Sequence, residues 1–209
     1  MPLDLWFAFA VASALLLMSP GPTVLLVLSY ALSQGRRVAV AMALGVALGD
    51  LIAMTASLAG LGALVLASAT LFSVLKWVGA AYLVWLGVKL LRSRPAALEE
   101  ESGGVPEQRP ARAIFAHAAL VTALNPKSIA FFIAFVPQFL RPEAPLAPQF
   151  ATLIATFVGL AALNALSYAL LADRLRAQIR RPSVLRWMTR AGGGALIGMG
   201  ALTATAARN

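Results

Sequence analysis

Residues 4–33 read DLWFAFAVASALLLMSPGPTVLLVLSYALS and contain no charge after Asp4. A helix that spans a bilayer needs about 20 apolar residues, so this stretch is long enough to cross one. The Ser-Pro-Gly-Pro sequence at 19–22 interrupts it, because a proline inside a helix removes a hydrogen bond and clashes with the preceding turn. A cleaved signal peptide would begin with basic residues, whereas this segment begins with Asp4. The stretch therefore predicts a retained membrane helix that is broken near its middle.

The rest of the chain has a similar composition. Of its 209 residues, 60% are hydrophobic and 12% are charged, about half of the roughly 25% that is usual in soluble domains. A soluble fold of this size would leave too much of that apolar surface in water. This excludes an ordinary soluble enzyme and a disordered protein, and the lack of cysteine excludes disulfides and thiolate chemistry. Six membrane spans are predicted, at 4–33, 38–67, 71–91, 113–140, 147–172 and 186–207.

The expected fold is an all-α integral membrane protein with two inverted three-helix repeats. Residues 1–92 form the first repeat, 93–112 a cytoplasmic linker and 113–209 the second repeat, and the first and fourth helices are broken. Three spans in each half give the halves opposite orientations. Two patterns recur at an offset of 114 residues: Gly45-x4-Asp50 with Gly159-x4-Asn164, and Lys76-x2-Gly79 with Arg190-x2-Gly193.

The net charge of +9 reports orientation in the membrane rather than affinity for nucleic acid. Basic residues gather in the loops that face the cytoplasm. With six spans, the 1–2, 3–4 and 5–6 connections share one face. Of the 17 lysines and arginines, 13 lie there: Arg36, Arg37, Lys89, Arg92, Arg94, Arg109, Arg112, Arg174, Arg176, Arg180, Arg181, Arg186 and Arg190. Both termini are therefore predicted to be periplasmic.

Both breaks are followed by a signal for a new helix. Ser19 before Pro20 and Asn125 before Pro126 fit a helix N-cap followed by the first helical position. Each break would then present a half-helix N-terminus inside the membrane, where free N–H groups and a partial positive charge suit a substrate carboxylate. The predicted substrate-binding residues are Ser19, Pro20, Gly21, Pro22, Asn125, Pro126 and Lys127. The alternative is a pair of ordinary proline kinks that neighbouring helices tolerate.

Asp50 lies near the middle of the second span, where a charge is costly and usually functional. We interpret Asp50 as a proton carrier or an amine-binding carboxylate, with Lys76 as a second residue in ion coupling. The alternative is a structural ion pair, and the partner of Asp50 is left open between Lys76 and Lys127. Gly45-x3-Gly49 predicts close helix packing. No cysteine- or histidine-based metal cluster and no cofactor site is expected.

Four motifs together resemble a known family. They are Met18-Ser-Pro-Gly-Pro22, Gly45-x3-Gly-Asp50, Lys76-Trp-Val-Gly-Ala-Ala-Tyr-Leu-Val-Trp-Leu-Gly87, and Asn125-Pro-Lys127 with Phe131-Phe-Ile-Ala-Phe-Val-Pro-Gln-Phe139. In order and spacing they look like the lysine exporter (LysE) superfamily, in particular its homoserine/threonine resistance (RhtB-type) amino-acid exporters. The resemblance covers roughly residues 5–205.

The resemblance implies a multi-pass carrier of the bacterial inner membrane that exports homoserine, threonine or other neutral or basic amino acids, or derivatives of them. It also implies coupling to the proton gradient. No enzymatic activity is expected, because the sequence shows no cluster of polar catalytic groups. The alternatives are export of another small solute or ion, and a membrane assembly protein that transports nothing. The expected partners are a small-molecule substrate and the lipid bilayer, and the sequence leaves a homodimer open.

Overall fold

The structure, a computed structural model, describes residues 1–19, 21–67, 69–92, 108–141, 144–179 and 182–206. Within these ranges the regular structure is helical, with no strand. In chain order the elements are α1 (Leu3–Met18), α2 (Pro22–Gln34), η1 (Gly35–Val38), α3 (Ala39–Ala67), α4 (Ala69–Arg92), α6 (Ala111–Ala123), α7 (Pro126–Ala134), η2 (Val136–Phe139), α8 (Leu146–Ile179) and α9 (Pro182–Ala206).

Both predicted breaks are confirmed. The first predicted span consists of α1 and α2, and the fourth consists of α6 and α7, which are bent by 45° relative to each other. Two boundaries differ from the prediction. The helix of the fifth predicted span, α8, continues to Ile179, and α9 begins at Pro182, so both helices extend beyond the predicted bounds of 147–172 and 186–207. Most of the predicted linker, residues 93–107, lies outside the described residues.

Length and composition mark several of these helices as membrane spans. In the described part of the chain, two segments are long and apolar enough to cross a bilayer: Pro22–Ala63, which runs from α2 through η1 into α3, and Leu146–Ala172 in α8. The bent pair of α6 and α7 also qualifies if it counts as one span. Large apolar side chains such as Val40, Leu44 and Leu120 are more than half exposed, which suits contact with lipid. The predicted total of six spans stays a prediction.

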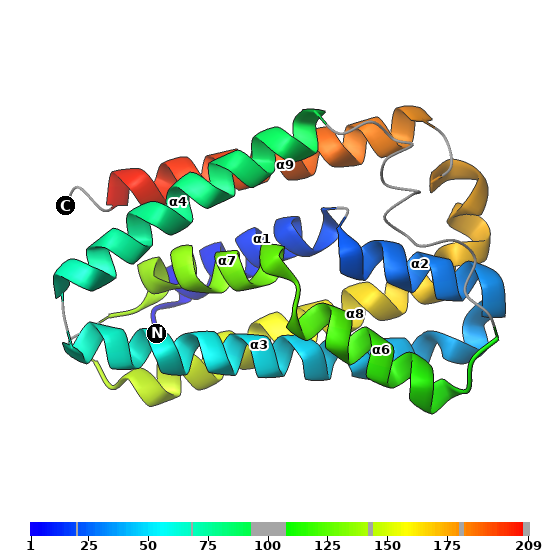
Figure 1. Ribbon diagram of the computed structural model, residues 1–209, viewed down its shortest axis with the longest axis horizontal. Coiled ribbons are helices and arrows are strands. Elements are labelled where there is room, and N and C mark those ends of the chain that lie inside the picture. Colours follow the sequence, from blue (N-terminus) through cyan, green and yellow to red (C-terminus); the bar gives the residue numbers. More distant parts are fainter. Residues whose placement is uncertain (20, 68, 93–107, 142–143, 180–181, 207–209) are drawn as a thin grey trace.

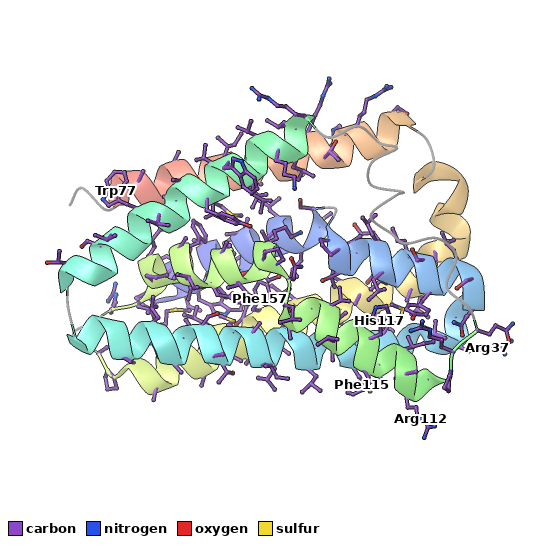
Figure 2. The ribbon with its side chains drawn as sticks, in the orientation of Figure 1. Arg37, Trp77, Arg112, Phe115, His117 and Phe157 are labelled. Atoms are coloured by element: carbon purple, nitrogen blue, oxygen red, sulfur yellow. The ribbon has the colours of Figure 1, made fainter. Side chains whose placement is uncertain are left out.

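The broken helices lie at the centre of the molecule. Figure 1 shows α1 and α7 between the pair of α4 and α9 on one side and the pair of α3 and α8 on the other, and the contacts of α1 with α8 and α9 and of α7 with α3 and α4 agree. In the same view, α1 begins and α9 ends on the left, whereas Arg37 and Arg112 lie at the opposite end (Figure 2). This arrangement brings the two breaks together in the interior.

Aromatic and small residues pack this interior. The buried rings of Phe9, Phe131 and Phe157 stack between α1, α7 and α8, with centroid separations of 6.3 Å for Phe9 and Phe131 and 5.8 Å for Phe131 and Phe157. The predicted Gly45-x3-Gly49 packing is confirmed. A Cβ atom at Gly45 would lie 2.5 Å from the carbonyl oxygen of Phe115, and one at Gly49 would lie 2.5 Å from that of Ala119. Glycine therefore sets how closely α3 approaches α6.

Candidate functional site

A small cavity lies where the two broken helices meet α3 and α8. Its volume is about 20 Å³, room for about one water molecule. Much of its lining is apolar, from residues such as Leu16, Val46 and Ala161. The polar side chains that line it come from both halves of the chain: Thr23, Asp50, Asn125, Lys127, Ser128, Asn164 and Tyr168.

The second break is capped as the sequence predicts. The side-chain oxygen of Asn125 accepts a hydrogen bond of 3.0 Å from the backbone N–H of Lys127, and Pro126 occupies the first turn of α7. The amide group of Asn125 also donates to the hydroxyl of Thr23 over 3.2 Å, and the hydroxyls of Thr23 and Thr122 are 3.4 Å apart. Asn125 therefore caps α7 and also ties the start of α2 to the junction of α6 and α7.

At the first break, the prediction that Ser19 is the N-cap is wrong. Gly21 is the N-cap of α2, Pro22 begins the helix, and no side chain caps it. A residue that precedes a proline is disfavoured in the helical region. Ser19 and Gly21 both precede prolines and both are extended, with ψ of 128° and −179°. The helix therefore restarts at the second proline. Pro20 lies outside the described residues.

Lys127 crosses from the second break to the first. Its ammonium group donates to the carbonyl oxygens of Leu16 at 3.1 Å and Ser19 at 2.8 Å, although it lies 111 and 108 residues away in sequence. Lys127 is 8% exposed. Gly21 makes room for it, since a Cβ atom at that position would lie 3.1 Å from the ammonium nitrogen. Lys127, which follows the second break, thus holds the first break through these two hydrogen bonds.

Asp50 faces the same cavity from α3. It is 1% exposed, and its Oδ1 atom has no hydrogen-bond partner in the described part of the structure. Asp50 and Lys127 attract each other electrostatically. Lys127, one of the two predicted partners of Asp50, lines the same cavity. Lys76 lies in α4, and its side chain is outside the part of the chain that the structure describes.

Of the other predicted substrate-binding residues, those that the structure describes are not among the residues that line the cavity. Ser19 is buried and packs closely on Gly192 of α9, whereas Pro22 and Pro126 are exposed. Four polar lining residues were not predicted as site residues: Thr23, Ser128, Asn164 and Tyr168. One pattern could have identified Asn164, because it lies 114 positions after Asp50 and corresponds to it in the repeat.

Replacing Asn125 by Ala is expected to lower stability, because α7 loses its cap and the hydrogen bond to Thr23 is lost as well. Loss of an N-cap costs about 1 kcal/mol, which corresponds to a fall of about 2–4 °C in melting temperature for a chain of this length. The measurement is thermal unfolding of the purified protein in detergent. Asn125→Asp keeps the cap acceptor and is expected to recover part of the loss. Equal melting temperatures for Asn125→Ala and the unchanged protein would contradict the role of the cap.

Comparison with known proteins gives matches that cover nearly the whole chain. Residues 14–207 match the family model described as LysE type translocator. A protein of Vibrio cholerae named uncharacterized membrane protein is 34% identical over 99% of both chains. A protein of Salmonella typhimurium named homoserine/homoserine lactone efflux protein is 34% identical over 99% of this chain and 98% of its own. No solved structure matches.

Proposed function

Because the chain belongs to the LysE type translocator family, we propose that this membrane transporter exports homoserine or a similar small amino acid across the bacterial inner membrane. We also propose that proton entry drives the export and that both termini are periplasmic. The observation that carries the substrate class is the cavity between the two breaks, which is lined by one acidic side chain, Asp50, and one basic side chain, Lys127.

The charges and donors of the cavity fit a zwitterion. Asp50 can pair with the substrate amine. An ammonium group has three N–H donors, and Lys127 uses two of them on Leu16 and Ser19, so the third is left for the substrate carboxylate. The hydroxyl of Thr23 and the amide of Asn164 can then meet a polar substrate side chain, such as the hydroxyl of homoserine. The name of the relative from Salmonella supports this substrate class.

Transport requires the cavity to open. Its volume of about 20 Å³ is far below the roughly 300 Å³ or more of an ordinary ligand pocket. We propose that two inverted repeats rock against each other around the breaks, as in other carriers with broken helices. The packing of α3 and α8 supports such a symmetry, because α3 contacts both α6 and α7, and α8 contacts both α1 and α2.

Asp50 is the proposed proton carrier. It lines the cavity, lies in α3 and has an unpartnered oxygen in the described structure. His117, the only histidine of the chain, is not among the residues that line the cavity, and its Nδ1 atom is 2.9 Å from the hydroxyl of Tyr30. In one cycle Asp50 would release the substrate amine on the periplasmic side and take up a proton there.

Efflux from vesicles tests the proposal. Purified protein in liposomes loaded with radiolabelled homoserine is expected to release it when the outside is made more acidic than the inside. For exchange of one proton per substrate, a difference of one pH unit supports about a tenfold outward concentration ratio of homoserine, because a tenfold proton ratio is worth about 1.36 kcal/mol. Threonine, lysine and glutamate form the comparison panel. Equal flux for all four that ignores the gradient would indicate a channel, and no flux for any would favour an assembly protein.

A further inference from the structure

The carboxyl end of α1 presents a row of backbone carbonyl groups to the interior. The last carbonyls of a helix have no partner within that helix. Here four consecutive ones accept hydrogen bonds from side chains of the other half of the chain. Leu16 and Ser19 accept from Lys127, Leu17 accepts from Asn164 at 3.1 Å, and Met18 accepts from the hydroxyl of Tyr168 at 3.4 Å.

This is the chemistry of a monovalent-cation site. The carboxyl end of a helix carries a partial negative charge. In carriers with broken helices, unwound carbonyls and half-helix carboxyl ends coordinate the coupling Na⁺ or H⁺. The carbonyl oxygens of Leu16 and Ser19 lie at the break and hold a positive charge, but the charge belongs to the side chain of Lys127. Gly21 admits it, because a Cβ atom there would also lie 3.4 Å from Cε of Lys127.

We propose that the carboxyl end of α1 is a monovalent-cation site whose permanent occupant is the Lys127 ammonium group. The tethered ammonium replaces a free Na⁺ ion at this place, so the wild-type carrier needs no sodium. The site also gives the two buried charged residues different roles. Lys127 stays positive and holds the break together, which leaves Asp50 to exchange the proton. This last consequence rests on the proposed function, whereas the cation site itself does not.

The test removes the built-in cation and supplies a free one. Lys127→Ala protein is purified in detergent, and its melting temperature is measured in equal concentrations of choline, sodium and ethylammonium chloride. Ethylammonium or sodium is expected to raise the melting temperature of Lys127→Ala by about 3 °C or more relative to choline, which is the size of shift that roughly 1 kcal/mol of binding gives. The wild-type protein is expected to melt at one temperature in all three salts. If Lys127→Ala also melts at one temperature in all three salts, there is no such site.

Two controls locate the bound cation. Lys89→Ala removes an exposed lysine whose ammonium lies 5.5 Å from the ring centre of Trp85, and it is expected to show no dependence on the salt. The double variant Lys127→Ala with Asp50→Asn separates the carbonyl site from simple pairing with Asp50. A cation effect that persists in the double variant supports the carbonyl site, and one that vanishes overturns it.

Lys127→Ala could also fail to accumulate as folded protein. In that case the yield of monodisperse protein from cells grown with and without ethylammonium becomes the measurement. A higher yield with ethylammonium supports the site, and an unchanged yield overturns it. All of these readouts are independent of transport, so they do not depend on whether homoserine is the substrate.

Discussion

Replacing Asp50 by Asn is expected to stop efflux and to leave the protein folded in the membrane. Asparagine has nearly the same shape but can neither carry a proton nor neutralise a substrate amine. Loss of the charge pair that Asp50 would form with the bound substrate amine costs about 2–5 kcal/mol of binding, which corresponds to a loss of about 30-fold or more in rate. The measurement is homoserine efflux from vesicles, with the amount of inserted protein determined in the same preparation.

The fold should survive because the carboxylate makes few contacts that asparagine would lose. Asp50 is 1% exposed, yet its Oδ1 atom accepts no hydrogen bond within the described residues. A charge without full neutralisation is costly inside a membrane, so a neutral side chain relieves that cost. Unchanged efflux from well-inserted Asp50→Asn protein would remove Asp50 from the mechanism.

Two further variants sharpen this result. Asp4→Asn makes the same chemical change at an exposed position in α1 and is expected to leave efflux unchanged. Asp50→Asn combined with Asn164→Asp moves the carboxylate to the matching position of the second half. This exchange is expected to fail, because the amide group of Asn164 donates to the carbonyl oxygen of Leu17, and a carboxylate there would repel it.

Local sequence was enough to predict the elements that decide where the site lies. Proline inside an apolar run predicted both breaks, and Asn125 before Pro126 predicted the cap of α7, because these effects act within a few residues. The same logic failed at Ser19. Two prolines compete there as the start of a helix, and the restriction on the residue before each proline keeps Ser19 and Gly21 extended.

The contacts between the halves could not be predicted from local patterns. Lys127 was predicted as a substrate-binding residue, but its hydrogen bond to the carbonyl oxygen of Leu16 joins residues 111 positions apart. Asn164 and Tyr168 are ordinary polar residues in an apolar span until the fold brings them to the end of α1. The repeat indicated which positions of the two halves correspond, but not which residues they contact. Asp50 and Asn164 correspond in sequence and yet have different partners.

Corresponding positions of the two halves also differ in how closely a neighbouring helix approaches them, and this difference predicts a large effect on stability. Gly45 and Gly159 are 114 residues apart and correspond in the repeated pattern. A Cβ atom at Gly45 would lie 2.5 Å from the carbonyl oxygen of Phe115 and 2.9 Å from Cβ of Ala118, whereas one at Gly159 would meet no atom within 4 Å. A backbone carbonyl cannot move aside as a flexible side chain can, so Gly45→Ala must push α3 away from α6.

Gly45→Ala is therefore expected to destabilise the protein by about 3 kcal/mol, the upper part of the usual cost of overpacking. For a chain of this length that is a fall of about 6–12 °C in melting temperature, measured in detergent. Gly159→Ala makes the same change without a clash and is expected to keep or slightly raise the melting temperature, because alanine is favoured over glycine in helices by about 1 kcal/mol. Equal shifts for the two variants would mean that the close approach of α3 to α6 does not determine stability. A large fall at Gly45 alone would show that the two halves share a pattern while only one of them uses its glycine for packing.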